Sequence, residues 1–439
     1  MFFLYNVLLT TGYVLLLPRF LFDWARKGKY AAGIGQRLGK LPEFEQNEKP
    51  VLWLHCVSVG ETQAARPLVK KIRKRFPEYR IVVSTTTNTG QKLAQEIFAE
   101  DAELVFYFPL DWKFTVRRAL RQIKPSVVLL METELWFNFL REARQGGTKI
   151  AIVNGRLSEK SVNRYLRVGK FMQRVLHYVD LALMQGNQDA KRISQLGIRP
   201  GKIKVTGNIK YDLRFDEAES ELTKLFRRRF NLGEDAPLIV AASTHAPEEE
   251  WILQAFKSVW KNSEGGLPRL LIAPRHPERF AEVEKLIKDS GFDWAKRSEK
   301  PSDRDKTAEI ILFDSIGELR AAFPLAEIVF VGGSLIPHGG QSVLEPAIAR
   351  KAIITGFYTA NFEAVTKEFL EQEALIQLPE LDEKQVSEML AESISNLLKD
   401  SELRQTLADN AYNVMRRNRG ATKKTVEYLK PLLEVHDDL

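Results

Sequence analysis

The sequence lacks several features that would point to particular protein classes. It has a single cysteine, Cys56, in 439 residues, which rules out an internal disulfide and fits a reducing compartment. No cluster of cysteine and histidine has the spacing of a zinc site. The GxxxxGKS/T motif of P-loop enzymes is missing, which argues against triphosphate chemistry of that type. Glycine (26 residues) and proline (19 residues) are too few for a collagen-like or low-complexity chain.

The overall composition is that of a folded globular protein. Hydrophobic residues make up 44% and charged residues 28%, which excludes a disordered chain and a multi-span membrane protein. At roughly 150 residues per domain, the length predicts about two or three domains. The net charge of +8 suits an anionic membrane surface, a phosphate-bearing ligand or nucleic acid. Nucleic acid is disfavoured because no stacking aromatics are interleaved with the basic residues.

The N-terminus is apolar and uncharged from residue 2 to residue 17. This length is near the lower limit for a spanning helix, which needs about 20 apolar residues. It lacks the basic segment and the small-residue cleavage site of a secretory signal. Basic residues follow it, and by the positive-inside rule they keep the rest of the chain cytoplasmic. We expect residues 1–22 to be a membrane anchor, either spanning or monotopic, with burial against the protein body as the alternative.

Beyond residue 50, short apolar runs alternate with longer helical patterns. This alternation predicts two α/β domains with doubly wound parallel sheets, because strands covered on both faces are almost continuously apolar. The first set of predicted strands is 51–57, 80–85, 103–108, 126–131, 149–153, 181–184 and 203–205. The second set is 238–242, 269–273, 309–313, 326–331, 352–355 and 375–378.

A polar stretch at 212–237, with a charged helix at 219–229, separates the two sets of strands. It divides the chain into Rossmann-like domains at 23–212 and 213–439. The helical C-terminal segment from Lys384 is expected to pack back across a domain surface, with its last helix on the N-terminal domain as one possibility. Ligands of such sheets bind at the carboxyl ends of the strands, so the loops after the strands are the candidate sites.

Three of these loops carry the pattern S-x-x-E, at 58–61, 315–318 and 342–345. The simplest interpretation is a capping box that opens a helix. The alternative is an anion site, since helix N-termini offer free amides and partial positive charge. Gly339 and Gly340 allow a ligand to approach the backbone closely and favour a phosphate-bearing ligand in the second domain.

Other loops carry charged side chains with more than one interpretation. Arg275 and His276 follow a strand and suit a phosphate or carboxylate, although a solvent-exposed turn remains the alternative. Glu132 and a second carboxylate, Glu134, end a buried strand, where they are costly unless paired or functional. Lys210 is expected near the cleft between the domains or as a surface charge. The D-x-D at 303–305 lies in a polar run and is interpreted as a loop rather than a metal site.

Seven motifs in order resemble those of the Kdo transferases, which attach 3-deoxy-D-manno-oct-2-ulosonic acid (Kdo) to a lipid A precursor. They are 55–62 (HCVSVGET), 131–136 (METELW), 154–158 (NGRLS), 206–212 (TGNIKYD), 243–245 (STH), 274–279 (PRHPER) and 330–335 (FVGGSL). The resemblance covers nearly the whole chain. It implies a GT-B fold, with two Rossmann-like domains facing a cleft. It also implies inverting transfer of Kdo from CMP-Kdo to lipid IVA in lipopolysaccharide core biosynthesis, on the cytoplasmic side of the inner membrane.

The resemblance also implies roles for particular residues. Glu61 matches the general base, and Glu132 and Lys210 match residues that stabilise the transition state. The predicted CMP-Kdo contacts are Arg275, His276, Ile316, Gly317, Glu318, Ser342, Val343, Leu344 and Glu345. No bound metal and no cofactor are expected. Two departures lie in the donor half, because Gln341-Ser342 and Phe357-Tyr358 replace the His-Asn and Pro-His of many members.

Two other functions remain open on the sequence. One is a different GT-B glycosyltransferase, which would use a UDP-sugar on a lipid-linked acceptor. The other is a membrane-tethered protein that binds anions or lipids without catalysis, in which the three S-x-x-E segments would serve only as helix caps.

Overall fold

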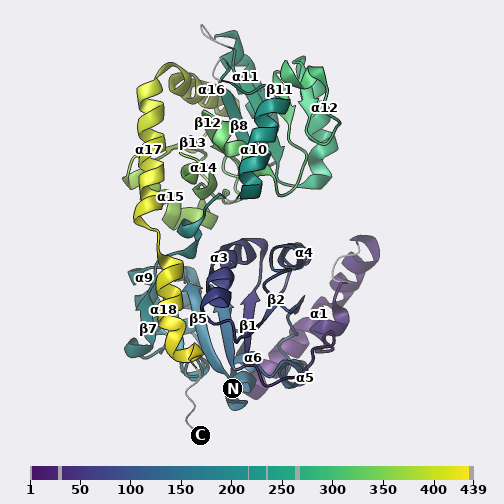
Figure 1. Cartoon of the computed structure of the whole chain (residues 1–439), viewed down its shortest axis with the longest axis vertical. Coiled ribbons are helices and arrows are strands. Elements are labelled where there is room, and N and C mark those ends of the chain that lie inside the picture. Colours follow the sequence, from purple (N-terminus) through teal and green to yellow (C-terminus); the bar gives the residue numbers. More distant parts are fainter. Residues whose placement is uncertain (1, 28–31, 216, 234–235, 263–266, 435–439) are drawn as a thin grey trace. The chain divides into compact units, whose positions relative to one another are not determined.

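The computed structural model describes residues 2–27, 32–215, 217–233, 236–262 and 267–434. The chain forms two compact units (Figure 1). The first unit comprises Met1–Asp212 and Asn418–Leu439, and the second comprises Leu213–Arg417. The chain therefore enters the second unit after Asp212 and returns to the first unit at Asn418.

The first unit is built on a seven-stranded parallel sheet with the order β3-β2-β1-β4-β5-β6-β7. Its strands are β1 (Val51–Cys56), β2 (Arg80–Thr85), β3 (Leu104–Tyr107), β4 (Val127–Met131), β5 (Lys149–Gly155), β6 (Leu181–Met184) and β7 (Ile203–Val205). The central strands β1, β2 and β4 are buried along their whole length, as expected for strands that helices cover on both faces.

Two hydrophobic cores lie on opposite faces of this sheet, because alternate side chains of each strand point to opposite sides. One core is covered by α3 (Val59–Arg75), α4 (Asn88–Ile97) and α18 (Ala421–Leu433). The other is covered by α5 (Lys113–Ile123), α6 (Phe137–Gln145), α7 (Glu159–Leu166), α8 (Gly169–Leu176) and α9 (Asn187–Gln195).

Helix α18 comes from the end of the chain and completes the first of these cores. Its side chains Val426, Leu429 and Leu433 are buried among residues of α3 and the sheet. The carboxylate of Asp212 accepts hydrogen bonds from the backbone N–H groups of Gly420 (2.6 Å) and Thr422 (2.5 Å). A negative charge at a helix N-terminus is favourable, so Asp212 fixes the start of α18.

The second unit contains a seven-stranded parallel sheet with the order β10-β11-β9-β8-β12-β13-β14. Its strands are β8 (Leu238–Thr244), β9 (Arg269–Pro274), β10 (Trp294–Lys296), β11 (Ile310–Leu312), β12 (Ile328–Val331), β13 (Ala352–Thr355) and β14 (Ile376–Gln377). Its helices are α10 (Glu217–Arg229), α11 (Glu248–Lys261), α12 (Phe280–Ser290), α13 (Leu319–Ala322), α14 (Leu344–Ile348), α15 (Glu363–Glu371), α16 (Glu383–Lys399) and α17 (Ser401–Arg417).

The predicted fold class, α/β with two doubly wound parallel sheets, is confirmed. A strand occurs at each of the thirteen predicted positions. The sequence analysis missed β10, a three-residue strand at the edge of the second sheet, because the segment Trp294–Lys296 has no apolar run. The charged helix predicted at 219–229 is α10.

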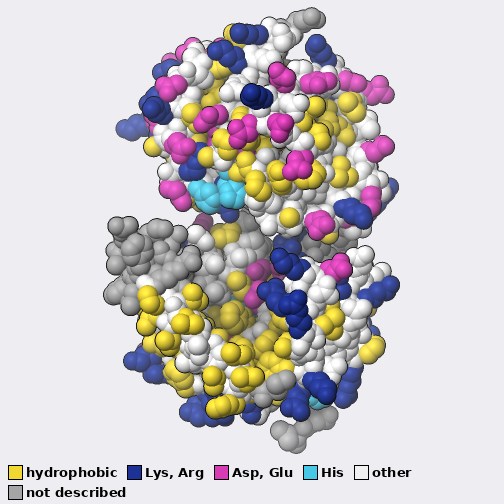
Figure 2. All heavy atoms as spheres, turned by 180° about the vertical axis from the view of Figure 1, so that it is seen from behind, with side chains coloured by type: hydrophobic (Ala, Val, Ile, Leu, Met, Phe, Trp, Pro, Cys, Tyr) yellow, Lys and Arg dark blue, Asp and Glu magenta, His cyan; other side chains and the backbone are white. Residues whose placement is uncertain are grey.

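Helix α1 (Phe2–Lys27) packs one side against the first unit and contains Pro18. The hydroxyl of Tyr5 donates to the buried carboxylate of Asp111 at 2.7 Å, and the ring of Phe2 packs edge-on against Phe171. The exposed large apolar side chains of α1, called here the apolar face of α1, are those of Phe3, Leu4, Val7, Leu8, Val14, Leu15, Leu16 and Leu17. Figure 2 shows hydrophobic side chains gathered on the surface of the first unit.

Within the described ranges, no helix combines the length and the hydropathy that crossing a bilayer requires. The structure therefore does not support the predicted anchor at residues 1–22 as a spanning helix.

Candidate functional site

Glu61 lies in the first turn of α3, directly after the carboxyl end of β1. Its side chain is buried, with 6% of its surface exposed. The backbone N–H of Val57 donates to Oε2 at 2.8 Å, and the hydroxyl of Ser58 donates to Oε1 at 2.9 Å. Ser58 also caps the helix, because its Oγ accepts from the N–H of Glu61 at 3.4 Å. The first S-x-x-E segment is therefore a helix cap that also holds a carboxylate in a fixed position.

Burial raises the pKa of Glu61 to about 7, far above that of an ordinary glutamate. The hydrogen bonds from Val57 and Ser58 act in the opposite direction, and the negative charges of Glu132 and Glu134 add to the rise. The loss of hydration thus outweighs these two hydrogen bonds, each of which on its own lowers the pKa of the carboxyl group. A carboxylate with a pKa near neutrality is suited to accept a proton at physiological pH.

Glu132 lies between two cations at the carboxyl end of β4, next to β1 in the sheet. Its Oε1 is 3.0 Å from Nζ of Lys210, and its Oε2 is 2.8 Å from Nε of Arg156. Burial raises the pKa of Glu132, but Lys210 and Arg156 outweigh it and hold the pKa below its usual value. Glu132 has a φ of 55°, an unfavourable backbone conformation for a residue with a side chain.

The positions of Arg156 and Lys210 are fixed by hydrogen bonds between neighbouring loops. The side-chain oxygen of the buried Asn154, at the end of β5, accepts from the N–H of Ile209 at 2.9 Å. This bond ties β5 to the 3-10 turn Ile209–Asp212 that carries Lys210. The hydroxyl of Thr133 donates to the carbonyl of Arg156 at 2.6 Å. The structure thus brings the three predicted catalytic residues to one edge of the first sheet.

In the second unit, three adjacent strands each end in a loop that carries a histidine. His245 follows β8, His276 follows β9, and His338 follows β12. The ring centroids of His245 and His276 are 5.2 Å apart, and those of His245 and His338 are 4.7 Å apart. Figure 2 shows histidine side chains gathered at one place on the second unit. We call these three residues the imidazole cluster. Arg275, also exposed, adds a positive charge beside it.

The glycine-rich loop after β12 already binds an anion from the protein itself. Glu248, the first residue of α11, is fully buried. Its carboxylate accepts from the N–H groups of Gly333 (2.7 Å), Ser334 (3.0 Å), Leu335 (3.0 Å) and His245 (2.9 Å). The first half of the glycine run therefore serves an internal carboxylate, and the amides of Gly333 to Leu335 are not available to a ligand phosphate.

The second and third S-x-x-E segments are not capping boxes. In 315–318 the helix begins only at Leu319, and Glu318 accepts from Nη2 of Arg297 at 2.9 Å. Ile316 is largely exposed, and Gly317 has a φ of 85°. In 342–345 the hydroxyl of Ser342 accepts from the N–H of Leu344 at 3.3 Å, with no reciprocal bond from the glutamate. Val343 and Leu344 are buried, and Glu345 is half-buried. The cause is the same in both segments. Each is a loop that leads into a short helix, of four residues in the first case and five in the second.

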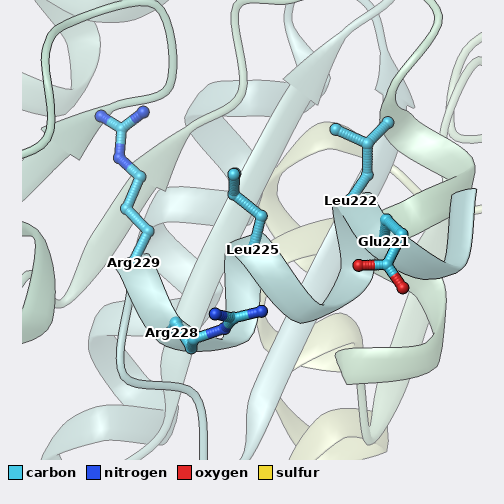
Figure 3. A pocket seen from close by; sticks show the side chains of 5 residues that line it. All are labelled: Glu221, Leu222, Leu225, Arg228 and Arg229. Carbon is cyan, nitrogen blue, oxygen red and sulfur yellow. The ribbon is translucent and has the colours of Figure 1, made fainter. Parts of the chain in front are cut away.

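A hollow of about 510 Å³ lies over α10 and is lined by Glu221, Leu222, Leu225, Arg228 and Arg229 (Figure 3). None of the predicted site residues lines it. Nε of Arg229 is 2.6 Å from Oδ2 of Asp305, and both side chains are buried, so the D-x-D at 303–305 contributes to a structural ion pair. In the described part of the chain, no three or more His, Cys, Asp or Glu side chains are grouped so that they could hold a metal ion.

Comparisons with known proteins identify the family. The sequence model of the family described as "3-Deoxy-D-manno-octulosonic-acid transferase (kdotransferase)" matches residues 32–213. The 3-deoxy-D-manno-octulosonic acid transferase of Haemophilus influenzae is 33% identical over 406 residues, which cover 92% of each chain. The chain belongs to the Kdo transferase family. A second transferase of the same name, from Chlamydophila psittaci, is 34% identical over 81% of this chain and 80% of its own.

As a member of the Kdo transferase family, the chain is an enzyme of the glycosyltransferase class. The fold agrees with that class. A glycosyltransferase from Rickettsia africae has a TM-score of 0.57 over 89% of this chain and all of its own, at 14% identity. Such a low identity shows a shared fold of two Rossmann-like units and nothing further.

The sequence analysis assigned no role to two residues that organise these sites. Arg156 lies at the carboxyl end of β5, the strand next to β4, and this adjacency of an arginine and a glutamate was the available signal. Glu248 belongs to a run of three glutamates that resembles a solvated helix start. Two of the three, Glu248 and Glu249, are fully buried, and the sequence carries no sign of that burial.

Proposed function

We propose that this Kdo transferase moves Kdo from CMP-Kdo to the lipid A precursor lipid IVA in lipopolysaccharide core biosynthesis, with inversion at the transferred carbon. Family membership supports the transferred sugar and the reaction class. The two groups of predicted site residues lie on different sheets, as an enzyme with an acceptor-binding and a donor-binding domain requires. The GT-B arrangement, in which the two sites face a common cleft, is part of this proposal.

The proposed reaction is a direct displacement. A hydroxyl oxygen of the acceptor sugar forms a bond to the anomeric carbon of Kdo. The bond from that carbon to the phosphate oxygen breaks, and its electron pair leaves with CMP. The transition state has oxocarbenium character, as in other glycosyl transfers. The hydroxyl proton goes to Glu61, which acts as the general base.

The observation that carries this assignment is the buried carboxylate of Glu61, with a pKa of about 7. Such a group is largely ionised just above neutral pH and still binds a proton well, which a carboxylate at an ordinary pKa does not. Hydrogen bonds from Val57 and Ser58 hold both carboxylate oxygens. The base is therefore oriented before the substrate arrives, which lowers the cost of reaching the reactive geometry.

Lys210 and Arg156 supply the positive charge of the proposed acceptor site. The ammonium group of Lys210 would balance the carboxylate of Kdo or the charge that develops on the leaving phosphate. Glu132 orients Lys210 through the 3.0 Å ion pair and holds Arg156 on its other side. Because Glu132 is buried and paired, it stays ionised at neutral pH.

The donor is proposed to bind at the carboxyl edge of the second sheet. The predicted donor contacts lie in loops that follow three strands of this sheet. Arg275 and His276 follow β9, segment 316–318 follows β11, and segment 342–345 follows β12. Guanidinium and imidazole groups in these loops suit the phosphate of a nucleotide donor.

The apolar face of α1 is proposed to attach the enzyme to the cytoplasmic leaflet of the inner membrane. Phe3 is 82% exposed and Leu15 is 74% exposed, values that are unfavourable for large apolar side chains in water. A helix with one anchored and one apolar side is suited to lie in the membrane interface. The exposed basic residues 70, 71 and 73–75 at the end of α3 would add attraction to anionic lipid.

The test replaces Glu61 by glutamine and measures Kdo transfer from CMP-Kdo to lipid IVA by product mass. Glutamine has the same size and accepts a hydrogen bond, but it cannot take up a proton. We expect the rate to fall about a hundredfold to ten-thousandfold. A rate within a factor of three of the wild type would rule out Glu61 as the base and leave it only its capping role.

The matched control is Glu142→Gln. Glu142 is buried to the same degree in the same unit and pairs with Arg117, outside the predicted site. It therefore reports what the loss of a buried carboxylate does to folding alone. A Glu61→Gln variant that loses activity while both variants unfold at similar urea concentrations assigns the loss to the chemistry.

A further inference from the structure

The imidazole cluster brings together three of the six histidines of the chain, although its members are separated by 31 and 62 residues. Each comes from the loop after a different strand, and β9, β8 and β12 are neighbours in the sheet. The rings meet edge-on or tilted, at interplanar angles of 86° and 44°, so they pack on one another. His276 and His338 are exposed, and His245 lies buried between them.

The carboxylate of Glu248 occupies the glycine-rich loop after β12 and so limits where an anionic ligand can bind at this edge of the sheet. Glu248 uses the N–H groups of Gly333, Ser334 and Leu335, so a ligand phosphate has to find other donors. Exposed donors beside this loop include the imidazoles of His276 and His338 and the guanidinium of Arg275.

His245 is the buried member of the cluster, and a hydrogen bond holds it in one tautomer. Its Nδ1 is 3.1 Å from the carbonyl oxygen of Ser243, which can only accept, so Nδ1 carries the proton. Burial, together with the charges of His338 and His276, lowers the pKa of His245 to about 4. His245 is therefore neutral at neutral pH, and its Nε2 is left as a hydrogen-bond acceptor.

The loop that carries His338 is held in place by backbone contacts. The N–H of Gly340 donates to the carbonyl of Gly333 at 2.7 Å, and the side-chain amide of Asn361 donates to the carbonyl of His338 at 2.9 Å. Gly339 has a φ of 89°, and a Cβ there would lie 2.7 Å from Asn361. The imidazole of His338 is thus presented from a rigid loop, which reduces the entropy lost on binding.

We propose that His338 and His276, whose rings pack against His245, bind the phosphate group of the nucleotide donor, which makes His338 a further ligand-binding residue of this enzyme. The inference deepens the proposed function and rests on it, since it names the contact that the donor half makes with the nucleotide. Two exposed imidazole N–H donors beside Arg275 match the several acceptor oxygens of a phosphate.

The experiment measures binding by calorimetry for CMP, UMP and their nucleosides cytidine and uridine. The proteins compared are the full-length wild type, His338→Ala, His338→Gln and the control His177→Ala. His177 is an exposed histidine of the first unit, far from these loops in the sequence. The quantity of interest is the ratio of monophosphate to nucleoside affinity, because it isolates the contribution of the phosphate.

We expect the wild type to bind CMP more tightly than cytidine, and His338→Ala to reduce this ratio about tenfold or more, as loss of a hydrogen bond to a charged group does. The affinity for cytidine itself should stay within a factor of two, and His177→Ala should match the wild type. Because His338 is exposed, its replacement should not disturb the hydrophobic core. An unchanged cytidine affinity of His338→Ala and His338→Gln would show that both variants are folded.

Two outcomes overturn the inference. One is an unchanged ratio in both His338 variants, and the other is a wild type that binds no monophosphate more tightly than its nucleoside. If UMP rather than CMP shows the advantage, and His338→Ala removes it, the phosphate contact is supported while CMP-Kdo as the donor is rejected. Failure of the inference and failure of the proposed function are therefore distinguished.

Discussion

Glu132 and Lys210 are 78 residues apart in the sequence, yet a carboxylate oxygen of one lies 3.0 Å from the ammonium nitrogen of the other. The pair forms where the carboxyl end of β4 meets the turn that follows β7. Its second carboxylate oxygen contacts Arg156, so the buried negative charge is shared by two cations. The ion pair therefore fixes the position of Lys210, while Arg156 balances part of the negative charge of Glu132.

A double-mutant cycle tests this relationship. We expect Glu132→Gln and Lys210→Met each to lower kcat/KM about a hundredfold, a size typical of losing one electrostatic contact to the transition state. Because the side chains are in direct contact, the double variant should lose less than the sum, with a coupling of about 0.5–3 kcal/mol. Steady-state kinetics with CMP-Kdo and lipid IVA measure it. Fully additive losses would show that the two residues act independently.

The pKa of Glu61 predicts the acid side of the pH profile. The base works only when ionised, and its pKa of about 7 means that protonation removes activity as the pH falls through 7. At pH 6 about one tenth of the enzyme should carry the ionised base, so kcat/KM should be about tenfold below its plateau. Profiles from pH 5.5 to 9 measure this. A plateau that continues down to pH 5.5 contradicts the assignment.

Glu248 is predicted to support both stability and donor binding. Replacing it with glutamine leaves one acceptor oxygen and turns an NH₂ group toward backbone N–H donors. We expect a loss of about 2–4 kcal/mol in the free energy of unfolding, measured by urea denaturation, together with weaker CMP binding. The control is Glu250→Gln, because Glu250 is exposed on the same helix and should change stability by less than about 0.5 kcal/mol.

The apolar face of α1 is predicted to carry membrane binding. Leu8 and Leu15 are 62% and 74% exposed, so replacing both with aspartate should leave the fold intact and remove apolar area from the membrane contact. We expect binding to vesicles of anionic phospholipid to fall at least about tenfold in a sedimentation assay. Leu403→Asp, on α17 of the second unit and 41% exposed, is the control. Equal binding by both variants places the attachment outside α1.

The sheets could be predicted from the sequence because burial on both faces leaves a signal of near-continuous apolar runs. Strand β1, with buried residues at every position, is a clear case. Strand β10 has no such signal, since its three residues lie at the sheet edge and Trp294 and Lys296 are only partly covered. The S-x-x-E pattern predicted a helix cap correctly in one case of three, because only Ser58 stands directly before its helix, whereas the other two helices begin later, at Leu319 and Leu344.

The candidate site was predictable to the level of loops but not of contacts. Loops after parallel strands gather at one edge by topology, which brought Glu61, Glu132 and Lys210 to the same region. Which carboxylate pairs with which cation depends on turns such as the one at Glu132, whose positive φ the sequence does not reveal. The occupant of the glycine loop, Glu248, could not be foreseen because its burial arises from packing.

Helix α18 makes the first unit depend on residues that are synthesised after the whole of the second unit. Apart from Ala421 and Val426 of the same helix, the buried residues that form a core with Leu429 and Leu433 are synthesised more than two hundred residues earlier. The second unit, by contrast, is one uninterrupted stretch from Leu213 to Arg417. During translation we expect the second unit to close first, because one core of the first unit stays incomplete until α18 has been made. We therefore expect the reverse of the usual order of co-translational folding, in which the N-terminal domain folds first.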